Sequence, residues 1–290
     1  VKVDSVGKLK GGDSKKVGAN VTDSNLEFAF DMFKQINKED VDKSIFISPL
    51  SISTALSMTY NGAGTTTAQA MAKALRYEGI DLSALNESYR NLIGYLNSHK
   101  DVELNIGNSI WVRKGEAIKP EFLSVNRDMF GALASELDFS KEDAASTINQ
   151  WISDATKKKI EKMIDPPIPA DVVMYLINAI YFKGQWAQQF DKNSTFDTKF
   201  HLEDGKTKDI KMMSRKGEVK YGSGDGFKVV SLPYGKGKTA MYCILPDKDT
   251  SINDFIGKLT AEKWKQIKGS VANVDDVILQ IPKFKMEYGI

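Results

Sequence analysis

The chain has 290 residues, of which 41% are hydrophobic, and this is enough for one large domain or two small ones. Its 40 Lys and Arg nearly balance its 38 Asp and Glu, so neither a nucleic acid nor a membrane surface is indicated as a partner. The single Cys excludes a disulfide within the chain, and no apolar run reaches the length of a membrane span.

Residues 1–21 are rich in Gly, Lys and Ser and predict a flexible N-terminal tail. The tail also lacks the long apolar core of a signal peptide. Its apolar side chains are more numerous than a pure linker needs, so docking of the tail on the body of the protein is the alternative. These side chains are Val1, Val3, Val6, Leu9 and Val17.

Helix start signals follow the tail. Ser24 is expected to cap a helix, because apolar residues recur after it at helical spacing. A short strand should then run into Ser48. Pro49, placed at a first helical position, predicts a core helix over residues 49–60 that carries few charges.

Capping and periodicity indicate the next elements. Thr66 and Gln69 fit a capping box, which predicts a helix over residues 66–75. Residues 102–112 alternate between apolar and polar, which is typical of a strand with one buried face. We also expect helices over residues 82–96 and 119–130, a brief strand over 137–139, and a helix from near Asp143.

A continuous apolar run begins near Asp171, and its β-branched and aromatic residues predict a strand buried on both faces. Asn178 interrupts this run. A buried Asn without hydrogen-bond partners costs roughly 1–3 kcal/mol, so it must be paired. It either pairs locally and only stabilises the core, or ties this strand to an element that must move.

The last hundred residues predict mainly strands. Phe200–Thr207 reads as a hairpin with Asp204-Gly205 at its turn, so it is expected to join two antiparallel strands. Further strands are predicted over residues 229–234, 239–246 and 277–283, with one or two helices over 252–264.

No catalytic or metal-binding motif is found. The two histidines, His99 and His201, have no partner at metal-ligand spacing, so zinc is not expected. Residues 222–226 lack the Lys and helix of a phosphate loop and predict a surface loop. The basic run at residues 157–159 predicts a solvated helix end, with a polyanion site as the less favoured alternative. Cys243 is expected to be an inert core thiol. The sequence therefore indicates neither an enzyme nor a cofactor.

Several sequence motifs, in order along the chain, resemble motifs of the serpins, the serine-protease-inhibitor superfamily. Residues 176–186, LINAIYFKGQW, resemble the third strand of the serpin central sheet. SPLSI at residues 48–52 resembles a second signature, although many members have Asn where this chain has Ser44. INQW at residues 148–151 resembles the helix that lies across the front of that sheet, and IPKFKME at 281–287 matches a later strand.

The resemblance implies an α+β fold with a large, mostly antiparallel central sheet, further sheets and about eight or nine helices. The serpin domain would span residues 22–290. Family members continue for several tens of residues beyond the matching phrase, so the C-terminal strands and the reactive loop are expected to be absent from this chain. A C-terminal fragment carrying that loop is accordingly an expected partner.

Two groups of site residues are implied by matching positions. Ser48, Ser51 and Asn178 match the shutter, which holds the middle of the central sheet closed. The breach is the top of the sheet, where loop insertion begins, and its matching residues are Gly184, Trp186, Thr195 and Lys283. The family position matched by Lys283 can pair with a carboxylate at the base of the loop.

The implied function is inhibition of chymotrypsin- or subtilisin-like serine proteases as a suicide substrate. A protease cleaves the reactive loop, stays covalently attached, and is distorted when the loop inserts into the sheet. The alternative is a non-inhibitory serpin that acts as a binding or chaperone-like protein. We expect a monomeric bacterial protein, comparable to thermophilic members, in an extracellular or cell-envelope location, with the cytoplasm as the alternative.

Overall fold

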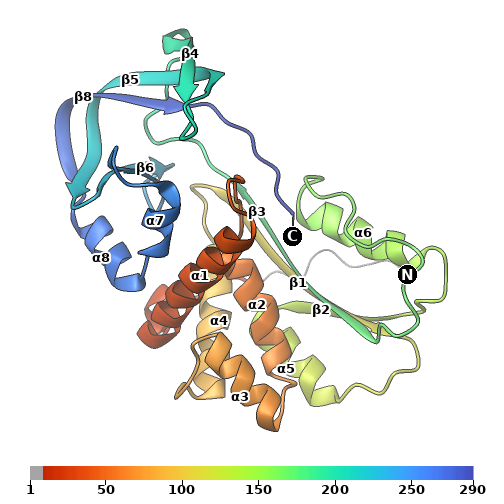
Figure 1. Cartoon of the computed structure of the whole chain (residues 1–290). Helices are drawn as coiled ribbons and strands as arrows, with labels where there is room; N and C mark the ends of the chain where they lie inside the picture. Colours follow the sequence, from red (N-terminus) through yellow and green to blue (C-terminus); the bar gives the residue numbers. More distant parts are fainter. Residues whose placement is uncertain (1–8, 290) are drawn as a thin grey trace. The chain divides into compact units, whose positions relative to one another are not determined.

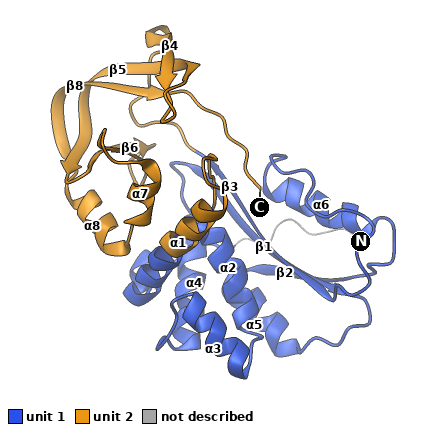
Figure 2. Ribbon diagram, in the orientation of Figure 1, with its two compact units in different colours: residues 1–29, 48–183 blue, residues 30–47, 184–290 orange. Residues whose placement is uncertain are grey.

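The computed structural model describes residues 9–289, which form two compact units (Figure 2). Of the described residues, unit 1 comprises 9–29 and 48–183, and unit 2 comprises 30–47 and 184–289. Helix α1 (Ala19–Glu39) contributes to both. No helix in residues 9–289 is long and apolar enough to cross a membrane.

The helices of unit 1 begin and end at local signals. The Ser48 hydroxyl accepts a hydrogen bond from the Ser51 N–H at the start of α2, and Asp81 caps α4 in the same way. Gly131, at φ 65°, ends α5 in a left-handed conformation. The helices are α2 (Pro49–Tyr60), α3 (Thr65–Ala74), α4 (Leu82–Leu96), α5 (Pro120–Phe130) and α6 (Ala144–Ala155), with a short 3-10 helix η1 (Ser14–Lys16).

Three local predictions in this region were wrong. Ser24 lies inside α1, where its hydroxyl donates to the Arg76 carbonyl at 2.5 Å instead of capping the helix. Gly64, and not Thr66, is the N-cap of α3, and no side chain caps this helix. Residues 44–48 have no regular secondary structure, so the predicted strand does not form there.

Residues 9–18, part of the predicted tail, lie against α4, whereas residues 1–8 lie outside the described residues. Ser88, Asn91 and Ser98 follow one side of α4 and its end, and they accept hydrogen bonds from backbone N–H groups of this segment at 2.9–3.1 Å. Gly12 packs on Gly94 so closely that a Cβ on Gly94 would lie 2.8 Å from the Gly12 nitrogen.

The sheet of unit 1 has three strands in the order β2-β1-β3. They are β1 (Glu103–Arg113), β2 (Ala132–Leu137) and β3 (Met174–Lys183). β1 pairs in parallel with β2 and antiparallel with β3. Figure 1 shows α6 on one side of this sheet and α2 and α5 on the other.

These two helical layers explain why the burial of the strands differs from the prediction. On β1, Ile106 and Ile110 pack into the core on the α2 and α5 side, while Trp111 packs with α6. Hence β1 is buried on both faces, not on one. β3 packs on both faces, with Leu176 and Ile180 against the core on the α2 side and Ile177 against the core with α6. Because it is an edge strand of the described sheet, only Ala179 is fully buried in it.

Unit 2 is built on a five-stranded antiparallel sheet in the order β4-β5-β6-β7, with β8 also paired to β5. The hairpin predicted at Asp204-Gly205 is confirmed, with Gly205 at φ 82°. Residues 222–226 form the end of β5 and a tight turn instead of a loose loop. The strands are β4 (Thr195–His201), β5 (Thr207–Gly224), β6 (Phe227–Tyr234), β7 (Thr239–Pro246) and β8 (Ala272–Pro282).

Helices α7 (Ile252–Gly257) and α8 (Ala261–Gly269) pack on this sheet, and a 3-10 turn, η2 (Lys192–Ser194), precedes β4. Phe255 and Ile267 bury their side chains against β6 in one apolar core. A second core joins β5, β6 and β8 through Val219, Leu232 and Leu279. The described residues thus contain eight α-helices and two sheets, and the predicted α+β class is confirmed.

Candidate functional site

A chain of side-chain hydrogen bonds crosses the sheet of unit 1 at Asn178. The Ser51 hydroxyl donates to the Asn178 side-chain oxygen. The Asn178 amide nitrogen donates to the Asn108 side-chain oxygen at 2.7 Å, and the Asn108 amide nitrogen donates to the Phe130 carbonyl at 2.7 Å. This shutter network therefore joins α2, β3, β1 and the end of α5.

Strand register brings the two asparagines together. Asn108 and Asn178 are direct cross-strand partners in the antiparallel pair of β1 and β3, so their side chains leave the sheet on the same face. That face is covered by α2, which places Ser51 above Asn178. Asn108 is 1% exposed, and a buried amide left without a partner costs about 1–3 kcal/mol. The network therefore holds the two strands to the covering helices, and breaking it would leave buried polar atoms without hydrogen-bond partners.

Only two of the three predicted shutter residues contact each other through their side chains. Ser51 and Asn178 contact each other, whereas Ser48 is exposed and its hydroxyl only caps α2, accepting from the Ser51 N–H at 3.4 Å. Asn108 was missed as a site residue. The signal was its position inside an alternating strand, but only the register of β1 against β3 shows that it faces Asn178.

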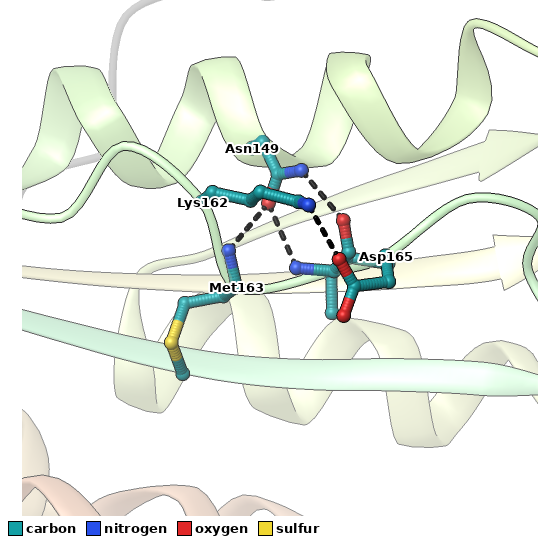
Figure 3. Close-up of polar contacts among 5 residues, drawn as sticks. Asn149, Lys162, Met163 and Asp165 are labelled. Atoms are coloured by element: carbon teal, nitrogen blue, oxygen red, sulfur yellow. Dashed lines mark hydrogen bonds and ion pairs between the residues drawn. The ribbon is translucent and has the colours of Figure 1, made fainter. Parts of the chain in front are cut away.

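Asn149 on α6 fixes the segment that leads from α6 toward β3 (Figure 3). Its side-chain oxygen accepts from the N–H groups of Met163 and Ile164, each at 2.9 Å, and its amide nitrogen donates to the Ile164 carbonyl at 2.8 Å. All three bonds come from one side chain. Lys162 and Asp165 form a more exposed ion pair beside it at 2.6 Å.

The predicted breach residues lie in unit 2. The ring of Trp186 stacks on Tyr234, with centroids 4.4 Å apart and planes at 16°. Trp186 and Lys283 both line a cavity of about 220 Å³, together with apolar side chains of β5, β6, β7 and β8. Lys283 is exposed, and its N–H donates to the Lys211 carbonyl at 2.8 Å.

The other two breach residues stand apart from this cavity. Thr195 begins β4 and is the strand partner of Met213, whose side chain does line the cavity. Gly184 follows β3 and lines none of the described walls. Trp186 and Lys283 therefore lie on the wall of the same cavity. Thr195 is linked to that cavity only through its strand partner Met213, and Gly184 only connects β3 to the next segment.

Two titratable side chains of unit 1 and unit 2 have pKa values shifted by burial. Within residues 9–289, no group of three or more His, Cys, Asp or Glu is placed to hold a metal ion. Cys243 is a free, half-buried thiol, and burial raises its pKa, which disfavours the reactive thiolate. Burial also raises the pKa of Tyr77, whose hydroxyl is held between Ser57 and Tyr89.

Comparison with known proteins finds similar chains in archaea and animals. An uncharacterized serpin-like protein of Methanosarcina mazei is 31% identical over 276 residues, covering 93% of this chain and 64% of that protein. Bovine leukocyte elastase inhibitor is 33% identical over 275 residues, covering 91% of this chain and 72% of that protein.

Among solved structures, native tengpin, described as a thermophilic serpin, is 29% identical with a TM-score of 0.83. The match covers 99% of this chain and 71% of tengpin. The chain spans less than two thirds of the two archaeal relatives it matches, 64% and 62% of their lengths. A family model described as serpin (serine protease inhibitor) matches residues 23–290, and the chain therefore belongs to the serpin family.

Proposed function

We propose that the whole protein inhibits serine proteases as a suicide substrate. Family membership supports inhibition in general, and the shutter network is the observation that carries the mechanism. A sheet that must open during inhibition needs a strand that is held by few, breakable side-chain contacts. Ser51, Asn178 and Asn108 supply such contacts to β3.

In this proposal, β3 borders the gap that receives the cleaved reactive loop. β1 lies on one side of β3, and the opposite edge is unpaired among the described residues. A new strand added at that edge would gain main-chain hydrogen bonds. The network holds β3 against α2 and β1 in the starting state, so the active form is stable by rate and not by free energy.

The breach residues would act where insertion starts. Trp186 and Lys283, on the wall of one cavity, are proposed to contact the base of the reactive loop. Gly184 connects β3 to the segment that carries Trp186. The loop itself is proposed to lie in the part of the protein that follows the sequence given, so the residue at the cleavage site is not assigned.

The targets are proposed to be chymotrypsin- or subtilisin-like serine proteases, met by a monomeric inhibitor outside the cytoplasm. The experiment incubates the whole protein with trypsin, chymotrypsin, elastase and subtilisin, followed by denaturing gel electrophoresis. A band heavier than either protein that survives boiling is expected with at least one protease; its mass is the sum less the C-terminal piece that cleavage releases. Clean cleavage without such a band for every protease would reject inhibition and favour a binding role.

Inactivated protease provides the matched control. A protease whose active-site serine is blocked beforehand should give no stable band, because the covalent bond forms through that serine. A band that persists with blocked protease would show a complex of another kind and would contradict the suicide mechanism.

A further inference from the structure

Arg215, on β5 of unit 2, has a guanidinium that is only partly satisfied. One terminal nitrogen, Nη1, donates to the Gln188 side-chain oxygen and to the Glu218 carbonyl at 3.3 Å. The guanidinium carbon lies 5.7 Å from the centre of the Phe190 ring. The buried Nε has no hydrogen-bond partner among residues 9–289.

No carboxylate of the described residues forms an ion pair with this guanidinium. Arginine has five N–H donors in a flat fork, which suits a carboxylate that accepts two parallel hydrogen bonds. A charge that is partly removed from water without such a partner is costly, and burial accordingly lowers the pKa of Arg215. The Arg215 side chain is therefore placed to bind an anion.

A cavity of about 80 Å³ lies beside Arg215. Trp186, Phe190 and Leu232 form apolar walls, while Ser231 adds a hydroxyl. One water molecule needs about 10–15 Å³ of volume accessible to its centre, so the cavity has room for several waters or for a small organic acid. We call it the Arg215 cavity.

We propose that the Arg215 cavity binds a small monocarboxylate, which accepts from the terminal N–H groups of Arg215 while Nε stays buried. Charge supports a monoanion, because Glu218 and Lys220 on the cavity wall offset each other and leave one positive charge. A phosphate dianion would meet the Glu218 carboxylate with no second cation. A short apolar tail fits against Trp186 and Phe190, which also line the neighbouring cavity of about 220 Å³.

The carboxylate has two sources with the same chemistry. It is either a free acid of two to four carbons or an Asp or Glu side chain of a polypeptide that occupies the cavity. The fork of Arg215 recognises both in the same way. Only a measurement at Arg215 itself distinguishes them.

The test records the Arg215 Nε–H signal by ¹⁵N NMR in the whole protein during titration with acetate, propionate and butyrate. Sodium chloride at the same ionic strength is the reference. A saturable downfield shift with the acids and not with chloride is expected. Saturation-transfer signals of propionate should fall at least tenfold in Arg215→Lys, which keeps the charge but not the fork, and persist in Arg90→Lys on α4.

Gln188→Ala provides a second variant, since it removes a partner of Arg215 and leaves the guanidinium in place. It should weaken propionate binding less than Arg215→Lys. A signal that already lies downfield without added acid and does not move with the acids would assign the carboxylate to a polypeptide side chain and reject the free acid. Equal shifts with chloride, meaning an adventitious ion only, or a signal that neither lies downfield nor moves with the acids, would overturn the site.

Discussion

The side chains of Asn108 and Asn178 form one amide-to-amide hydrogen bond of 2.7 Å across the pair of β1 and β3. Each asparagine also reaches out of the sheet, Asn178 to Ser51 on α2 and Asn108 to the Phe130 carbonyl. The two residues therefore connect both strands to helices that cover the sheet. Loss of either one leaves polar atoms of the other without partners.

Asn178→Ala should lower the free energy of unfolding by about 1–3 kcal/mol and speed conversion to an inserted, inactive form. The substitution leaves the Ser51 hydroxyl and the Asn108 oxygen unpaired. Conversion is measured as loss of inhibitory activity over time in the whole protein. Asn273→Ala, at an exposed strand position, is the control and should convert at the wild-type rate. An unchanged rate in Asn178→Ala would remove the shutter assignment.

A double-mutant cycle tests whether the two asparagines act as one unit. Asn108→Ala alone should destabilise at least as much as Asn178→Ala, because Asn108 is 1% exposed. The double variant should be more stable than the sum of the single changes predicts, with a coupling of about 0.5–3 kcal/mol measured by denaturant unfolding. If the destabilising effects of the two single substitutions simply add, the 2.7 Å hydrogen bond contributes no coupling energy between the two asparagines.

Local signals could be predicted from the sequence, but pairings distant in sequence could not. The helix Pro49–Tyr60 was predicted with its correct bounds, because Ser48 and Pro49 determine its start within a few residues. The start of α1 was missed because Ser24 looks like a cap, while its actual partner, the Arg76 carbonyl, lies 52 residues away.

In the candidate site, too, a local pattern identified single residues but not the contact between them. Asn178 was recognised as a polar residue in an apolar strand, and Asn108 lies in the alternating run 102–112 that predicted a strand. Their contact depends on the register of two strands separated by 70 residues, which neither local pattern contains. Likewise, burial of β1 on both faces depends on α6 packing across it, and an alternating pattern alone indicates only one buried face.

Gly94→Ala should detach residues 9–18 from α4, although alanine normally favours a helix by up to about 1 kcal/mol over glycine. A Cβ at Gly94 would lie 2.8 Å from the Gly12 nitrogen, closer than packed atoms allow. The expected result is faster tryptic cleavage after Lys10. Gly257→Ala at the end of α7 is the control, since open space surrounds that position. Equal cleavage in both variants would show that the segment does not depend on this close packing.

Asn149→Ala should loosen the segment after α6, because one side chain supplies all three of its hydrogen bonds to Met163 and Ile164 (Figure 3). Amide hydrogen exchange at residues 163 and 164 should become at least tenfold faster, equivalent to about 1.4 kcal/mol of lost protection. Gln150→Ala, which removes only an exposed contact with Asp154, should leave these amides unchanged. Equal protection in Asn149→Ala would assign the order of this segment to its apolar contacts.

Asp40 and Tyr288 form a pH-sensitive pair in unit 2, in which the Tyr288 hydroxyl donates to Asp40 at 2.6 Å. The hydrogen bond from Lys43 and then that from Tyr288 lower the pKa of Asp40 below 3.8. The contribution of Asp40 to stability is fully present above its unfolded pKa and is lost as the pH falls through the folded value. Burial and then the bond to Asp40 raise the pKa of Tyr288 to about 12, so its contribution is present below its unfolded pKa of about 10 and is lost as the pH rises through about 12.

Titration of the Asp40 carboxyl by ¹³C NMR should therefore give a midpoint below that of an unperturbed aspartate. Tyr288→Phe should raise that midpoint, and Lys43→Met should raise it further, because Lys43 is the larger cause of the shift. Tyr221→Phe on β5 is the matched control and should leave the midpoint unchanged. If Tyr288→Phe also leaves it unchanged, the hydroxyl does not hold the Asp40 carboxylate in solution, and only Lys43 accounts for the lowered pKa.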